Sequence, residues 1–246
     1  MKWRLAAGAA AAAYGVRLLL GHRTIARHVS DYATHWGERP ADHPADVLHY
    51  VALGDSAAQG VGASSVDNGY VPIVARRLEE ATGRPVAVTN LSVSGAVSGD
   101  VVRDQLPQLA ALPFTPDLVT IDIGGNDALF PGHGVQSFTT SFTDIVKALP
   151  PGSVVADVPW FMTPGFARTS TRMAEVARRL ATEHGHHVAF LHQKSREVGR
   201  VHYHRHTARD WFHPNDRGYQ GWADAFWDAI EAAGLVERLR GSTPSA

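Results

Sequence analysis

The sequence contains no cysteine in its 246 residues. This absence excludes a disulfide framework, a thiolate nucleophile, and any zinc or iron–sulfur site held by cysteine. Any covalent chemistry must therefore come from serine, threonine, lysine, histidine or carboxylate side chains.

The sequence also carries almost no net charge. Its 23 basic and 24 acidic side chains give a formal net charge of −1. The basic residues are neither clustered nor interleaved with aromatic ones, which argues against a nucleic-acid partner. With 44% hydrophobic and 19% charged residues, the chain is large enough for one sizeable core and too short for two typical domains with linkers.

No apolar run reaches the length of about 20 residues that a membrane-spanning helix needs. The nearest approach is the uncharged run over residues 5–16, which is followed by Arg17. Residues 1–30 carry five basic side chains and no acidic one. A secretory signal, a short membrane anchor and a soluble amphipathic helix all fit this layout. We favour an uncleaved, membrane-associating helix, because basic residues follow the run where a signal peptide prefers small uncharged ones; a cytoplasmic or secreted location is left open.

Residues 31–46 are interpreted as a linker, since Pro40 and Pro44 stand in a stretch with few apolar side chains. One folded domain is then expected over residues 47–240. A chain that begins near Asp42 should be soluble and fully active. The opposing possibility is that apolar residues of the first segment pack against the domain as an extra helix.

Strand and helix patterns alternate along the predicted domain. Nearly continuous apolar strands with covering helices indicate a parallel sheet in a three-layer α/β/α sandwich. The strands are predicted over Val47–Leu53, Val86–Leu91, Leu118–Ile123, Val154–Val158 and Val188–Leu191. The helices are predicted over Ile73–Thr82, Val101–Leu112, Phe138–Leu149, Arg168–Glu183 and Asp216–Ala233.

Several familiar catalytic and cofactor motifs are missing. The sequence has no Gly-x-Ser-x-Gly elbow, no phosphate-binding Gly-x4-Gly-Lys-Ser/Thr and no His-Glu-x-x-His. Gly60-Val61-Gly62 lacks the third glycine of a dinucleotide fingerprint. Instead, small residues, amides and one hydroxyl follow the strands, and ligands of such sheets bind beyond the carboxyl ends of the strands.

Four short blocks stand at these places in the chain. They are Gly54-Asp55-Ser56, Asn90 to Gly95, Gly124-x-Asn126-Asp127 and Asp210-x-x-His213-Pro214. In order and strand context they resemble the signature blocks of the SGNH (GDSL-type) hydrolases, over roughly Val47 to Ala233. The resemblance implies a flavodoxin-like fold and a cofactor-free serine ester hydrolase. One departure is Ala57, where the family often has leucine.

Ser56 is the candidate nucleophile, with His213 as its base and Asp210 orienting the imidazole. A serine hydroxyl attacks poorly unless a neighbouring base takes its proton. The Asp-x-x-His spacing puts both side chains on one face of a helical turn, where the carboxylate can hold the required tautomer. Taken singly, Ser56 also fits a helix N-cap and His213 a surface residue.

The resemblance assigns the oxyanion hole to the backbone N–H groups of Ser56 and Gly95 and the side-chain amide of Asn126. Such donors stabilise the charge that develops on the tetrahedral intermediate. A turn glycine and an asparagine that bonds its own loop are the alternatives. Asp55 and Asp127 are interpreted as scaffold residues that bond loop amides.

Two further sets of residues invite a role. His202, His204 and His206 would share one face of an extended segment, but nearby arginines argue against a cation, and no metal site is predicted. Trp160, Phe161 and Met162 follow the fourth strand and are candidates for an acyl pocket, with Phe166, Trp211 and Phe212 near it; core packing is the equal alternative.

The predicted function is therefore hydrolysis of a carboxylic ester, acyl or lipid, through an acyl-serine intermediate. The partner is a small-molecule ester. The apolar residues after the fourth strand favour a short- to medium-chain acyl or lipid ester. The alternatives are a carbohydrate acetylesterase with the same three residues, and a non-catalytic lipid- or glycan-binding module.

Overall fold

The computed structural model describes residues 23–37 and 47–241. Its strands form one parallel sheet in the order β2-β1-β3-β4-β5. Their bounds are β1 (Leu48–Gly54), β2 (Val86–Asn90), β3 (Leu118–Asp122), β4 (Val154–Ala156) and β5 (His187–Ala189). All five predicted strands are present, and the order is that of flavodoxin-like folds. The prediction of a parallel α/β/α sandwich is confirmed.

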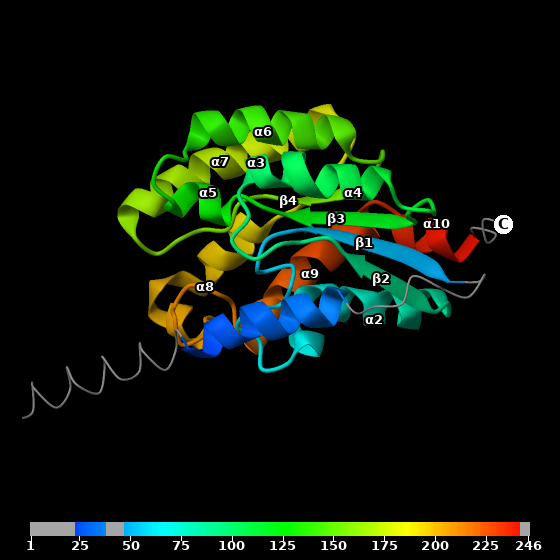
Figure 1. Ribbon diagram of the computed structural model, residues 1–246, viewed down its shortest axis with the longest axis horizontal. Helices are drawn as coiled ribbons and strands as arrows, with labels where there is room; N and C mark the ends of the chain where they lie inside the picture. Colours follow the sequence, from blue (N-terminus) through cyan, green and yellow to red (C-terminus); the bar gives the residue numbers. More distant parts are fainter. Residues whose placement is uncertain (1–22, 38–46, 242–246) are drawn as a thin grey trace, which may run out of the picture.

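Helices cover both faces of this sheet (Figure 1). One face carries the helix over residues 23–37 with α2 (Tyr70–Thr82), α9 (Asp216–Ala232) and α10 (Leu235–Gly241). The other face carries α3 (Ser98–Asp100), the π-helix η2 (Val101–Gln105), α4 (Leu106–Ala110), α5 (Gly125–Leu129), α6 (Val135–Ala148) and α7 (Pro164–Glu183). A short 3-10 helix η1 (Val66–Asn68) and α8 (Leu191–His206) complete the described elements.

The pleat of β1 explains why the core has two halves. Tyr50 and Ala52 belong to one buried cluster, whereas Val51 and Leu53 belong to the other. Successive side chains of a strand point to opposite faces, so a strand covered on both sides is apolar at nearly every position. This burial on both faces explains why the strands appear in the sequence as continuous apolar runs.

The predicted linker over residues 31–46 is wrong for its first part. Residues 23–37 form one helix, and its Tyr32 and Trp36 are each only 7% exposed. The Tyr32 hydroxyl donates to the carbonyl oxygen of Ala63 at 2.9 Å, and Trp36 Nε1 donates to that of Gln59 at 3.1 Å. Two buried aromatic side chains with satisfied polar ends therefore attach this helix to the domain. Residues 1–22 and 38–46 lie outside the described residues.

The histidine-rich segment also differs from its expected form. His202, His204 and His206 lie in α8, where His202 and His206 share a face four residues apart and His204 does not. The helix is interrupted at Gly199, which has φ of +65°. Among the described residues, no group of three His, Asp or Glu side chains is arranged to hold a metal ion. No helix in the described ranges has the length and apolar character to cross a membrane.

The burial of the first helix reverses the expected effect of truncation. A chain beginning at Asp42 loses the Tyr32 and Trp36 contacts, and we expect its free energy of unfolding to fall by about 3–5 kcal/mol, the cost typical of truncating a buried aromatic side chain. A chain beginning at Arg23 keeps the helix and should match the full chain. Thermal or urea unfolding of the three forms measures the difference. Equal stability of the Asp42 form would show that the helix contributes nothing.

Candidate active site

The topology brings three of the four sequence blocks together. β1 lies between β2 and β3, and the chain leaves these strands toward Ser56, Gly95 and Asn126 at the same edge of the sheet. The strand order reverses beside β1, which is where ligands of open parallel sheets bind. The position of the site is thus a consequence of the topology.

Gly54 fixes the start of the Ser56 loop. Its φ is +142°, and a Cβ atom there would lie 2.2 Å from the carbonyl oxygen of Asp122, so only glycine fits. Gln105, fully buried in η2, accepts from the Gly54 N–H at 2.9 Å and donates to the Gly54 carbonyl at 2.8 Å. One amide side chain therefore holds both backbone groups of the residue two positions before Ser56. Sequence reasoning missed Gln105, because nothing in a sequence marks a glutamine whose partners are backbone atoms.

Ser56, His213 and Asp210 form one chain of hydrogen bonds. Ser56 Oγ lies 2.9 Å from His213 Nε2, and His213 Nδ1 lies 2.5 Å from Asp210 Oδ2. Ser56 is 5% exposed, and the side chains of His213 and Asp210 are 11% and 7% exposed. Burial alone would raise the pKa of the Asp210 carboxyl. The hydrogen bond and charge of His213, together with the backbone N–H groups of Phe212 and His213, outweigh this effect, so the pKa is lowered. The carboxylate form is thus favoured beside the imidazole.

The turn that presents His213 is not the helical turn expected from the Asp-x-x-His spacing. Asp210 Oδ1 accepts from the backbone N–H groups of Phe212 and His213 at 3.1 and 3.2 Å, which closes an Asx-type turn. Trp211, inside this turn, has φ of +60°. Gly62 packs against the same loop, since a Cβ there would lie 2.4 Å from the Pro214 carbonyl oxygen. Gly60-Val61-Gly62 therefore serves close packing of the two loops.

The two other predicted oxyanion donors lie after β2 and after β3, Gly95 in a loop and Asn126 in the first turn of α5. Gly95 is exposed in the loop after β2, with φ of +84°. Asn126, 2% exposed, donates from Nδ2 to the Ala96 carbonyl at 2.9 Å and toward Asp55 Oδ2 at 3.3 Å. Its amide thus ties the start of α5 to the segments that follow β1 and β2.

Gln59 braces the loop that carries Gly95. Its buried side chain donates to the Ser92 carbonyl at 2.8 Å and accepts from Ser94 Oγ at 2.5 Å. The Gln59 backbone carbonyl in turn receives the Trp36 indole N–H. The first helix is therefore connected to the Gly95 loop through a single residue.

Asp55 and Asp127 bond loop groups, as predicted for scaffold residues. Asp55 Oδ1 accepts from the Ala57 N–H at 2.9 Å, and Asp127 accepts from the N–H and hydroxyl of Ser98 at 2.9 and 2.5 Å. Burial raises the pKa of the Asp55 carboxyl to about 6. The hydrogen bond from the Ala57 backbone N–H and the charge of His213 act in the opposite direction but do not outweigh burial. Burial also raises the pKa of Asp127.

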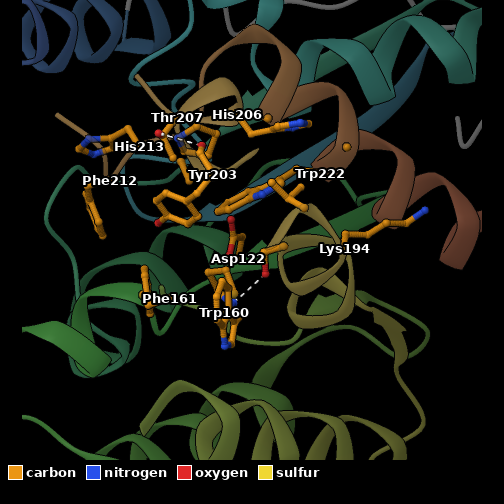
Figure 2. A pocket seen from close by; sticks show the side chains of 18 of the residues that line it. Asp122, Trp160, Phe161, Lys194, Tyr203, His206, Thr207, Phe212, His213 and Trp222 are labelled. Carbon is orange, nitrogen blue, oxygen red and sulfur yellow. Dashed lines mark hydrogen bonds between the residues drawn. The ribbon is translucent and has the colours of Figure 1, made fainter. Parts of the chain in front are cut away.

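A pocket of about 390 Å³ opens beside Ser56 and His213. Of the predicted pocket residues, Trp160 and Phe161 line it together with Phe212, whereas Met162 is not part of its lining. Most of the remaining wall comes from α8 and α9, including Tyr203, His206 and Trp222 (Figure 2). From the sequence, Tyr203 and Trp222 are not assigned to a pocket, and His206 is considered only as a metal ligand. The helix that carries Trp222 is predicted, but α8, which carries Tyr203 and His206, is not.

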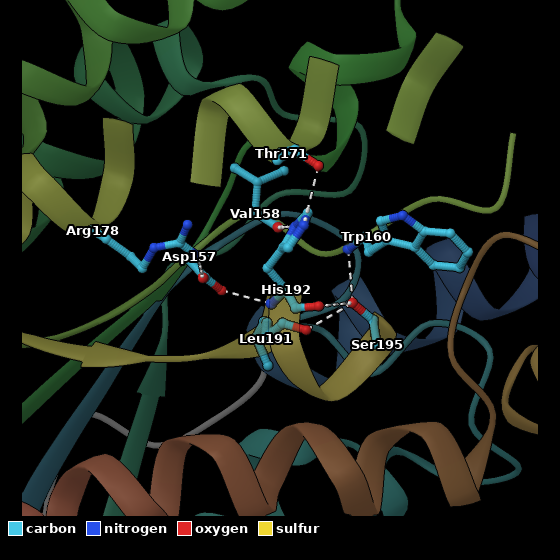
Figure 3. A network of polar contacts seen from close by, with 8 residues as sticks. All are labelled: Asp157, Val158, Trp160, Thr171, Arg178, Leu191, His192 and Ser195. Atoms are coloured by element: carbon cyan, nitrogen blue, oxygen red, sulfur yellow. Dashed lines mark hydrogen bonds and ion pairs between the residues drawn. The ribbon is translucent and has the colours of Figure 1, made fainter. Parts of the chain in front are cut away.

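A polar network holds Trp160 against the start of α8 (Figure 3). The backbone N–H of Trp160 donates to Ser195 Oγ at 2.7 Å, and the Ser195 hydroxyl donates to the Leu191 carbonyl oxygen at 2.7 Å. Asp157, 1% exposed, accepts from the His192 N–H and pairs with Arg178, each at 2.7 Å. The pocket wall formed by Trp160 is thus fixed by bonds between the β4–α7 loop and α8.

The sheet order and this constellation define a flavodoxin-like α/β protein with a Ser–His–Asp site. Residues 52–220 match the GDSL-like Lipase/Acylhydrolase family. Because the match spans more than half of the chain, the protein belongs to that family.

Individual relatives agree with this assignment. A GDSL-like esterase of Mycobacterium tuberculosis is 27% identical over 80% of this chain, and Lipase 1 of Streptomyces coelicolor is 41% identical over 37% of it. The matched regions span 65% and 34% of those relatives' own lengths, less than two thirds in each case.

Solved structures show the same fold at low identity. TesA superimposes with a TM-score of 0.62 at 22% identity, covering 76% of this chain and 99% of TesA. An acetylxylan esterase from Geobacillus stearothermophilus gives a TM-score of 0.62 at 22% identity, covering 74% of this chain and 94% of that one. These likenesses concern the fold alone.

Proposed function

We propose that this protein hydrolyses carboxylic esters through an acyl-enzyme on Ser56. The observation that carries the proposal is the hydrogen-bonded chain from Ser56 Oγ through His213 to Asp210. This chain gives the hydroxyl a base within reach and gives the base a fixed orientation, which nucleophilic catalysis requires. Membership of the GDSL-like family supports the same chemistry.

Each step has a group placed for it. His213 Nε2 takes the proton of Ser56 as Oγ attacks the ester carbonyl carbon, and then returns that proton to the leaving alcohol. Asp210 stabilises the imidazolium without itself being protonated. Water then attacks the acyl-serine with His213 again as base, releasing the acid and restoring the Ser56 hydroxyl. These steps use only side chains of the chain and water.

Asn126 supplies the third proposed oxyanion donor, beside the N–H groups of Ser56 and Gly95. Asn126 Nδ2 donates to the Ala96 carbonyl oxygen at 2.9 Å. The same nitrogen lies 3.3 Å from Asp55 Oδ2, longer than the usual N···O distance of about 2.9–3.0 Å. We assign the amide proton that is not held by Ala96 to the oxyanion.

Asn126→Ala is therefore expected to lower kcat by about 10²–10³-fold with a smaller effect on KM. The reason is that the amide bonds the developing oxyanion more strongly than the ground-state carbonyl. Steady-state kinetics on a p-nitrophenyl ester separates the two constants. A change confined to KM would make Asn126 a substrate-binding residue.

The direct test of the function is labelling of the purified protein by a fluorophosphonate, followed by turnover of p-nitrophenyl esters of increasing chain length. Stoichiometric labelling of Ser56 with ester cleavage supports the proposal. No labelling and no cleavage would favour the non-catalytic binding module. Release of acetate from acetylated xylan in preference to octanoate cleavage would favour the carbohydrate acetylesterase.

We further propose that the N-terminal segment predicted over residues 1–30 directs the protein to membranes, through residues 1–22, which precede the packed helix. The support is the basic, Ala- and Leu-rich sequence of that segment. Fractionation of cells that express the full chain or a chain beginning at Arg23 tests this, because only the first carries the segment. Recovery of the full chain wholly in the soluble fraction would reject the proposal.

A further inference from the structure

The pocket beside Ser56 has a buried carboxyl group in its lining. Asp122, the last residue of β3, lines the pocket and is 3% exposed. Its Oδ2 atom is buried and makes no hydrogen bond within the described residues. In Figure 2 the carboxyl group lies between Trp160 and Trp222 and points into the pocket. An acceptor of this kind is costly to leave unpaired.

The nearby basic groups do not supply that missing partner. Lys194 lines the same pocket, but its Nζ pairs with Asp228 at 3.0 Å, and Figure 2 shows its amine turned away from Asp122. His206 also lines the pocket, and burial lowers its pKa, which favours the neutral imidazole. No arginine contributes to the described lining.

The remaining walls are suited to hold a small organic group over Asp122. Trp160, Tyr203 and Trp222 supply aromatic surface, and Thr207 adds a polar edge. Burial and the neighbouring carboxyls Asp55 and Asp157 raise the pKa of Asp122. A neutral acid and a carboxylate both accept a hydrogen bond from a ligand, so the acceptor is present in either state.

We propose that this pocket selects substrates whose bound arm ends in an O–H or N–H donor, with Asp122 as the acceptor, over arms that end in a methyl group. This inference rests on the proposed ester hydrolysis, since the arm belongs to the ester held at Ser56. A site that presents a buried polar group rejects a ligand lacking the matching group, because the buried group then stays unpaired. The pocket is thus a specificity site for hydroxylated or amino-bearing esters.

Binding measured without turnover tests the proposal. Ser56→Ala protein is titrated with esters that differ only in the end group of one arm, which is methyl, hydroxyl or ammonium. The arm has a spacer of three to six carbons. It belongs to the acyl half of the ester in one series and to the alcohol half in another. Quenching of tryptophan fluorescence reports occupancy, because Trp160 and Trp222 line the pocket. We expect donor-ended esters to bind about 10- to 100-fold more tightly in one series. The hydroxyl and ammonium arms show which donor is preferred.

Asp122→Leu, made in the Ser56→Ala background, removes the acceptor at similar volume and should bring the ratio of affinities to about one. If that variant does not fold, Asp122→Asn serves, with a reduced ratio. Tyr70→Phe is the matched control. The Tyr70 hydroxyl is also buried without a partner in the described residues. Burial and, after it, the charge of Asp122 raise its pKa, but Tyr70 does not line the pocket. Its ratio should equal that of the parent.

Three results would overturn the proposal. They are equal affinities for methyl- and donor-ended esters in both series, a ratio unchanged by both Asp122 substitutions, and a ratio lost in Tyr70→Phe. Failure of the proposed function is seen separately, as absence of fluorophosphonate labelling and of ester turnover in the protein that retains Ser56.

Discussion

Ser56→Ala is expected to lower the kcat of ester hydrolysis by about 10⁴- to 10⁶-fold, the range found when the nucleophile of a hydrogen-bonded triad is removed. The acyl-enzyme cannot form without the hydroxyl, and the other groups retain only their effect on a bound water. The fold should persist, because one hydroxyl is lost from a loop that Gln105 and Gly54 hold through backbone groups. Initial rates on p-nitrophenyl acetate and the melting temperature together measure both effects.

A serine nearby in the chain provides the control. Ser65 is exposed and caps η1 through the Asp67 N–H, so Ser65→Ala should keep its activity and its labelling by a fluorophosphonate. Substantial turnover by purified Ser56→Ala, with Ser65→Ala unchanged, would mean that another residue is the nucleophile.

The features that the sequence predicts well are those that repeat or recur in order. β1 and β3 are buried at almost every position, and such strands appear as apolar runs that need no partner to be recognised. Because parallel strands end at one edge of the sheet, the residues after them meet there whatever the loops do. Ser56 and Asn126 follow this rule: Asn126, in the first turn of α5, contacts Asp55, the residue before Ser56.

The features that were missed depend on contacts made far away in the chain. α8 is polar and is interrupted at Gly199, so its pattern is weak, and its helix is stabilised by packing against α9 and by the Trp160 and Asp157 bonds at its start. The first helix has few apolar residues, and its position depends on bonds from Tyr32 and Trp36 to carbonyl oxygens 31 and 23 residues further along the chain. Local patterns cannot show such partners, and the part of the pocket wall that α8 supplies was missed for the same reason.

His213→Ala is expected to reduce kcat as severely as Ser56→Ala, because the two residues act as a unit. Without the imidazole, the Ser56 hydroxyl loses the acceptor that lies 2.9 Å away, and the leaving alcohol loses its proton donor. Asp210→Asn should cost somewhat less, since an orienting acid is usually the most dispensable member. Single-turnover kinetics with a fluorophosphonate measures the attack step alone and should show the same order.

The double variant Ser56→Ala/His213→Ala tests whether the two residues act as one catalytic unit. If the residues form one catalytic unit, its residual rate should equal that of either single variant, because the second substitution removes a group whose partner is already lost. Multiplication of the two single effects would show that they act independently. His213→Ala also removes an edge-to-face contact with Phe212, whose ring centroid lies 4.7 Å from that of His213. His213→Gln keeps a side chain in this place without the base, so it separates loss of packing from loss of the base. Near wild-type turnover in both His213 variants would place the base elsewhere, and His202 and His206, the other histidines that line the pocket, would then be the residues to replace.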